Sequence, residues 1–204
     1  MRSMGGTDVD EAVAEMLRVL GPHTSSDWQV RAGGLDWSCW KTAAHTAHDL
    51  LAYAGQVAGR PATAYLPYDL RIQPDAPPQE VLQVVAACGN LLSSAIATAD
   101  PDTRAWHWGP TDPTGFAALG VNETLMHTYD ITQGLGIAWL PSEPSCAAVV
   151  HRLFPDAPAG DPVQVLLWAT GRAELHGHPR QSPNWAVKAA IDQRASSRRD
   201  HHRP

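Results

Sequence analysis

The sequence predicts an all-α fold: a four-helix bundle with one long crossover and short additional helices towards the C-terminus. Apolar residues recur every three or four positions over four long segments, while the alternating patterns typical of strands are few. A proline-rich stretch separates the second of these segments from the third. At 204 residues, of which 44% are hydrophobic, the chain can bury the core of one domain.

The first two predicted helices span residues 9–20 and 40–57. Each run of helical apolar spacing ends where glycine and proline follow, at 21–22 and at 59–61. Residues 61–78 hold five prolines and show little periodicity, so we expect an extended crossover. A crossover of this length allows the helices of a bundle to run in the same direction.

The third predicted helix spans residues 79–98, and the fourth begins at 113 or 114 and runs to 134. Asp112 stands where it can cap the start of the fourth helix, because its carboxylate can accept from the first free amides. The stretch 106–113 between these helices is aromatic and rich in turn residues. We expect it to be a loop that lines a pocket.

Beyond the fourth helix, residues 146–153, 162–170 and 184–196 can form shorter helices, and 155–160 reads as a loop. The predicted organisation is therefore one helical bundle over residues 1–180. Residues 181–204 would follow as a short C-terminal helix and a disordered basic tail, with a recruitment arm as the alternative.

Charge and cysteine content exclude several classes of protein. The formal net charge of -6 argues against binding of nucleic acid, which requires a basic face. The three cysteines, Cys39, Cys88 and Cys146, are odd in number and far apart, so we expect reduced core thiols and not a disulfide framework. The chain has neither an apolar leader nor a run of roughly 18 apolar residues. We expect a cytoplasmic protein with no membrane partner, either a monomer or a homodimer.

One helical turn of the fourth helix carries the most informative residues. Glu123 and His127 are four positions apart, so their side chains lie on the same face of the helix and can hold one ion. A stable site needs a third ligand, for which His45 or His48 of the second helix is available. Two imidazoles and one carboxylate suit zinc and also fit Fe(II). Asp130 lies on roughly the same face and can orient a ligand.

The alternative to a metal site is a set of ordinary core or surface histidines. The chain has 10 histidines in 204 residues, so some Glu/His pairs at helical spacing are expected by chance. For His48 in particular, its neighbour Asp49 favours an exposed polar position.

Three stretches resemble one known family. They are residues 37–45, the pattern Gly120-x-x-Glu123-x-x-x-His127-x-x-Asp130, and the string 166–172. In this order they are similar to the N-terminal domain of mycothiol-dependent maleylpyruvate isomerases, within the DinB-like superfamily, over roughly residues 8–180. The resemblance implies a DinB-like four-helix bundle in which His45, Glu123 and His127 bind a divalent metal, usually zinc. It also implies mycothiol or another small thiol as cosubstrate.

The expected chemistry follows from the charge of the metal. A cation stabilises the thiolate form of a bound thiol, which can then attack an electrophilic small molecule, so a transferase or isomerase is expected. The isomerase has a separate C-terminal domain, whereas this chain is short and polar after residue 177, so isomerisation of maleylpyruvate itself is not expected. The alternatives are a metal-dependent hydrolase that uses bound water and a non-catalytic, metal-stabilised binding protein.

Further candidates for a substrate or thiol pocket are Arg71, Trp106 and Trp108. Arg71 in the crossover can meet a carboxylate, although an exposed loop arginine is the alternative. The two tryptophans, with His107 between them, can line the pocket or serve as core. For Arg172 we expect a contact with the end of a helix, where a cation offsets free carbonyl groups.

Overall fold

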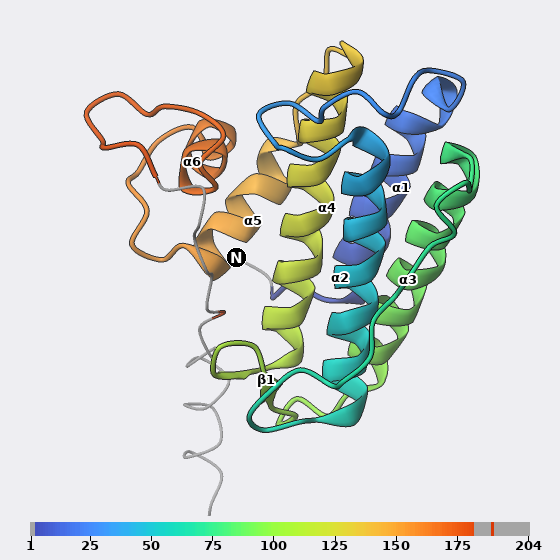
Figure 1. The fold of residues 1–204 in the computed structure, drawn as a ribbon. Coiled ribbons are helices and arrows are strands. Elements are labelled where there is room, and N and C mark those ends of the chain that lie inside the picture. Colours follow the sequence, from blue (N-terminus) through green and yellow to red (C-terminus); the bar gives the residue numbers. More distant parts are fainter. Residues whose placement is uncertain (1–2, 182–188, 190–204) are drawn as a thin grey trace, which may run out of the picture.

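A computed structural model describes residues 3–181 and residue 189, and it is predominantly helical (Figure 1). Four long helices form the bundle: α1 (Gly6–Leu20), α2 (Cys39–Gly59), α3 (Pro78–Thr98) and α4 (Pro113–Leu135). A short 3-10 helix, η1 (Gly21–His23), continues α1. The predicted all-α class is therefore confirmed.

Two shorter helices lie beside the bundle on the α4 side, α5 (Glu143–Leu153) and α6 (Pro162–Ala169) (Figure 1). α5 packs against both α4 and α6. Both helices were expected from the sequence, and residues 155–160 form the loop between them. The helix expected at 184–196 and the tail lie outside the described residues.

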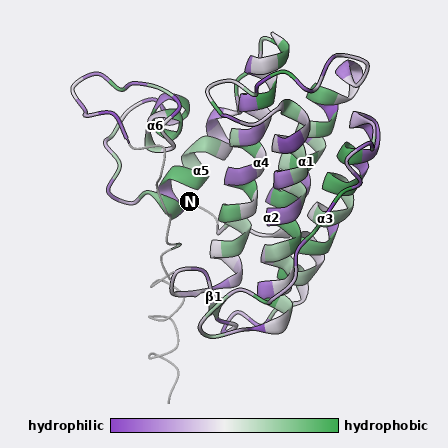
Figure 2. Cartoon of the chain, viewed as in Figure 1, coloured by the Kyte–Doolittle hydropathy of each residue, from purple (hydrophilic) through white to green (hydrophobic). Residues whose placement is uncertain are grey.

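The core lies between the four long helices, with α2 in contact with α3 and α4, and α1 in contact with the same two helices. Hydrophobic and hydrophilic residues alternate along these helices, as amphipathic packing requires (Figure 2). α4 is buried along most of its length. Gly120 allows this close packing, because a Cβ atom there would lie 2.6 Å from Cδ2 of Leu92.

Side-chain caps and left-handed residues set the helix ends. The Ser38 hydroxyl accepts from the Lys41 amide at the start of α2, and the Asp112 carboxylate accepts from the Gly115 amide, at 2.7 Å, at the start of α4. The expected cap at Asp112 is thus present. α2 and α4 end at Arg60 and Gly136, both with positive φ.

The proline-rich segment crosses from the end of α2 to the start of α3, so these two helices run in the same direction (Figure 1). The buried amide of Gln56 holds it in place. This side chain donates to the carbonyls of Ala64 and Trp106 and accepts from the Leu66 amide. Gln56 thereby joins the crossover to the aromatic stretch that precedes α4.

That stretch is more regular than expected, because it contains a two-stranded antiparallel hairpin, β1 (Ala105–Trp106) and β2 (Pro110–Thr111). Its tight turn holds Trp108 at a φ of 55° and Gly109 at 146°. The hairpin therefore fixes His107 and Trp108 relative to the start of α4.

Among the described residues, α3 is the one helix that is long and apolar enough to cross a membrane. In this fold α3 packs against α1 and α2, and its buried residues belong to the core of the bundle.

Candidate metal centre

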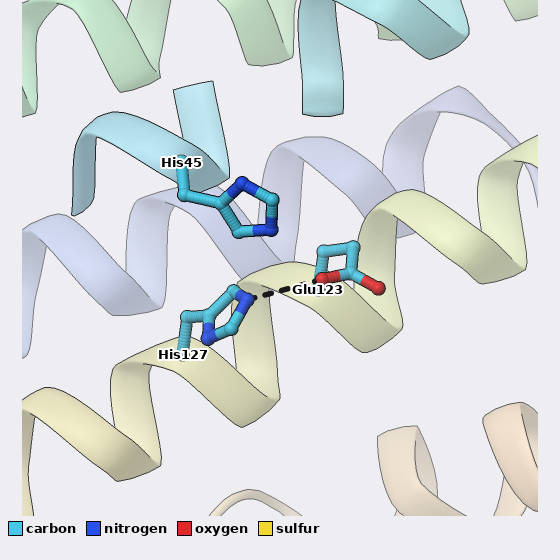
Figure 3. Close-up of side chains that lie close together, drawn as sticks. All are labelled: His45, Glu123 and His127. Carbon is cyan, nitrogen blue, oxygen red and sulfur yellow. Dashed lines mark ion pairs between the residues drawn. The ribbon is translucent and has the colours of Figure 1, made fainter. Parts of the chain in front are cut away.

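His45 from α2 faces Glu123 and His127 from α4 (Figure 3). One potential ligand atom from each of the three side chains lies within 4.8 Å of the other two. Glu123 and His127 occupy successive turns of α4, and their Oε2 and Nε2 atoms are 3.2 Å apart. The ring centroids of His45 and His127 are 5.3 Å apart. The structure thus brings together the three residues that the family resemblance implies as ligands.

These distances fit one small divalent ion. Zinc bonds of roughly 2.1 Å at tetrahedral angles place two ligand atoms about 3.4 Å apart. The Glu123 Oε2 to His127 Nε2 distance of 3.2 Å is close to this value. Three protein ligands leave a coordination position for an external molecule, as in catalytic zinc sites.

Asp130 orients His127 on the side away from Glu123. The Nδ1 atom of His127 lies 3.1 Å from Oδ2 of Asp130. A carboxylate in this position holds the proton on Nδ1 and leaves Nε2 for an ion. Asp130 thus lies where it can orient His127, and the role itself stays a prediction.

Arg172 in turn fixes Asp130 through two hydrogen bonds. Its Nε and Nη2 atoms donate to the two carboxylate oxygens at 2.9 and 2.6 Å, and Nη1 donates to the Thr170 carbonyl at 3.1 Å. The expected contact with a helix end is therefore present, since Thr170 caps the C-terminus of α6. The bidentate contact with Asp130 was not predicted. Forty-two residues separate the two side chains, and no local pattern connects them.

Burial and hydrogen bonding shift the ionisation of all three candidate ligands. Burial lowers the pKa of His45, which favours the neutral imidazole that a metal requires. Burial also acts to lower the pKa of His127, but hydrogen bonds to Asp130 and Glu123 outweigh it and raise this pKa to about 9. For Glu123, burial acts to raise the pKa, yet the hydrogen bond and charge of His127 leave it below its usual value. A metal ion would take the place of the His127 proton in this arrangement.

A second group, His45, His48 and Asp49, also has its potential ligand atoms within 4.8 Å of one another. His48 contacts Asp49 at 3.1 Å through Nδ1 and Asp69 at 3.1 Å through Nε2. Both nitrogens of His48 are therefore engaged by carboxylates. His45 belongs to both groups.

A cavity of about 1200 Å³ opens at the His45, Glu123 and His127 cluster. One face of α4 lines it with residues three and four positions apart, from Leu119 to Gln133. His45 and Tyr53 of α2, the loop 33–37, the hairpin and the segment after α6 complete the wall. The volume is sufficient for more than one small molecule.

The three residues proposed for the substrate or thiol pocket differ in whether they line the cavity. Trp108 lines the cavity together with His107, and Trp108 is 53% exposed. Within the described part of the chain, neither Trp106 nor Arg71 is among the lining residues. Trp106 packs against Tyr65 and Trp108, and the Arg71 side chain is 88% exposed beside Asp69.

These features define a class of protein: a helical bundle with a candidate metal site of two histidines and one carboxylate, open to a large cavity. A sequence model of the mycothiol maleylpyruvate isomerase N-terminal domain matches residues 9–132, and the chain belongs to this DinB-like family. The match includes all three candidate ligands and Asp130, but not Arg172. Neither a curated protein nor a solved structure matches the chain.

Proposed function

We propose that this protein is a metal-dependent transferase or isomerase that uses mycothiol or a similar small thiol. The observation that carries the proposal is the convergence of His45, Glu123 and His127 on a cavity large enough for a thiol and a second substrate. Membership of a mycothiol-related family supports the choice of thiol. The donor set supports zinc as the ion.

A divalent ion at this position would stabilise the thiolate form of an external thiol and so supply a nucleophile at neutral pH. The residues of the chain have distinct tasks around it. His45, Glu123 and His127 bind the ion, and Asp130 with Arg172 keeps the His127 ring in its binding orientation. The walls of the cavity hold the electrophilic substrate near the sulfur and limit access of water.

The thiol of the reaction comes from outside the chain. Cys39, Cys88 and Cys146 are all buried in the core. Burial raises the pKa values of their thiols to about 11, 11 and 12, so these groups stay protonated at neutral pH.

Metal analysis of the purified protein tests the site. We expect about one zinc or similar divalent ion per chain, and loss of the ion in His45→Ala, Glu123→Ala and His127→Ala. His48→Ala is the matched control, because His48 is also a partly buried histidine of α2, but its two ring nitrogens contact Asp49 and Asp69. Retention of metal in all three ligand variants would contradict the proposal. Loss of metal in His48→Ala alone would show that the ion binds at the second group, His45, His48 and Asp49.

A panel of electrophiles with and without small thiols tests the chemistry. We expect the metal-loaded protein to consume thiol and electrophile together, and the three ligand variants to be inactive. Turnover that does not need thiol would identify a hydrolase instead. Metal binding without turnover over the whole panel would favour a binding protein.

A further inference from the structure

Two polar side chains in the wall of the large cavity have no hydrogen-bond partner among the residues that the structure describes. They are Asn122 of α4, one position before the candidate ligand Glu123, and Tyr53 of α2; the Oδ1 atom of Asn122 is both buried and without a partner, whereas the Tyr53 side chain lines the cavity. Both are more than nine-tenths buried, with exposed fractions of 1% and 5%. Buried polar groups are nearly always satisfied, so the Asn122 Oδ1 atom requires an explanation.

Asn122 is an exception on its own helix. The neighbouring buried threonines of α4 bond to backbone carbonyls: Thr124 to Gly120 at 2.8 Å, and Thr128 to Thr124 at 2.6 Å. His127 and Asp130 bond to each other. The Oδ1 atom of Asn122 is enclosed and has no partner in the described part of the chain. An asparagine kept in this state costs stability, which an apolar side chain of the same size would avoid.

Tyr53 faces the cavity from the opposite helix. Its ring packs against His107 at 5.7 Å and Phe116 at 6.0 Å between ring centroids, which fixes the direction of the side chain. Burial, followed by the charges of Glu123 and Asp49, raises the pKa of Tyr53 well above its ordinary value. The hydroxyl therefore stays protonated and remains a hydrogen-bond donor.

We propose that Asn122 and Tyr53 form a subsite for an uncharged hydrogen-bonding group, such as an amide carbonyl, of a molecule held at the metal centre. The Asn122 amide can both donate and accept, and the Tyr53 hydroxyl donates. Neither the Asn122 amide nor the protonated Tyr53 hydroxyl supplies a positive charge that would favour an anionic group. The inference rests on the proposed metal- and thiol-binding function and adds to it the part of the ligand that the cavity recognises.

Binding of simple thiols to the cobalt-loaded full chain tests the subsite without knowledge of the substrate. Thiolate coordination to Co(II) gives a charge-transfer absorption band, which reports the affinity of each thiol. Three probes are compared: N-acetylcysteamine, which carries a neutral amide; 3-mercaptopropionate, which carries a carboxylate; and ethanethiol, which carries neither. The variants are Asn122→Leu and Tyr53→Phe, which keep the size of the side chain. Thr124→Val is the control, because it removes a buried hydroxyl of the same helix whose partner is a backbone carbonyl.

We expect each subsite variant to bind N-acetylcysteamine about three- to tenfold more weakly, as for loss of one hydrogen bond. The affinity for ethanethiol should stay within about twofold in all variants, and Thr124→Val should not change either probe. The melting temperature of Asn122→Leu should equal or exceed that of the wild type, since no partner is lost. If Asn122 only stabilised the fold, the melting temperature of Asn122→Leu would instead be lower than that of the wild type.

Several results would overturn the subsite. Unchanged affinity for N-acetylcysteamine in both variants would do so, and so would an equal loss for ethanethiol, which would show a general distortion of the site. A comparable loss of affinity for 3-mercaptopropionate would show that the subsite also accepts a carboxylate, which contradicts the preference for an uncharged group. Absence of any cobalt–thiolate band in the wild type would instead overturn the proposed function itself.

Discussion

Arg172 contacts the candidate metal centre indirectly, because it holds Asp130, which in turn contacts the candidate ligand His127. We expect Arg172→Gln to release the Asp130 carboxylate and to weaken metal binding by about 10- to 100-fold, as for other groups that orient a metal ligand. Competition with a chelator of known affinity measures this change.

Arg152 offers a matched control for Arg172. It forms a similarly buried ion pair with Asp112, at 2.7 Å, and neither partner lines the cavity among the described residues. Arg152→Gln should lower stability by a comparable amount and leave metal affinity unchanged. Equal weakening of metal binding in both variants would show that the effect is general destabilisation.

The three cysteines give a prediction about pH. Because burial raises the pKa values of Cys39 and Cys88 to about 11 and that of Cys146 to about 12, the thiolate form is scarce in the folded protein at pH 8. Iodoacetamide at pH 8 should therefore leave all three unmodified over a period in which it modifies them completely in urea. Mass spectrometry of the intact chain distinguishes these states. Rapid modification of any one cysteine in the folded protein would contradict its burial.

For individual residues, only part of the candidate site could be predicted from the sequence. The spacing of Glu123 and His127 predicted that they share one face of a helix, since that depends on local geometry. The choice between His45 and His48 required the family resemblance, because it depends on how α2 is rotated in the bundle. The Asp130–Arg172 contact depends on packing between distant segments, which no local pattern describes. The same holds for the Asn122 Oδ1 atom, which has no partner among the described residues.

Among the elements, α4 has the largest role, because it carries two of the three candidate ligands and one face of the cavity. Its N-terminus is fixed by Asp112, which caps Gly115 and pairs with Arg152. Asp112→Ala removes the cap, which is worth about 1 kcal/mol. It also leaves the partly buried Arg152 without this carboxylate, so the total loss should reach about 3 kcal/mol or more.

Urea denaturation measures the loss at Asp112. Ser142→Ala provides the comparison, because Ser142 caps α5 from an exposed position and has no cationic partner among the described residues. Its replacement should cost about 1 kcal/mol. Equal losses in the two variants would show that the Arg152 pair contributes nothing to stability.

The elements themselves were predictable where the signal is local. Helical apolar spacing, followed by glycine and proline, placed α1 to α4 within a few residues of their ends. The path of the crossover and the short hairpin were not predictable in detail, because the buried Gln56 side chain fixes both through contacts 8 to 50 residues away.

For the whole molecule, the candidate ligands come from two helices that are joined through the core of the bundle. α2 supplies His45, α4 supplies Glu123 and His127, and α1 and α3 pack against these helices. The unfolded chain has no preformed site, so an ion that binds here binds the folded state and stabilises it. The stabilisation grows with the concentration of free ion.

We therefore expect zinc to raise the melting temperature of the metal-free protein. At about 100 times the dissociation constant the gain is about 2.7 kcal/mol. For a chain of this size this corresponds to roughly 5–10 °C. Differential scanning calorimetry with increasing zinc, in a buffer that does not chelate it, measures the change. Glu123→Ala should abolish the increase, whereas His48→Ala should retain it, because only Glu123 belongs to the cluster that opens into the large cavity. The reverse pattern would place the ion at His48 and Asp49, and the stabilising link between α2 and α4 would then be absent.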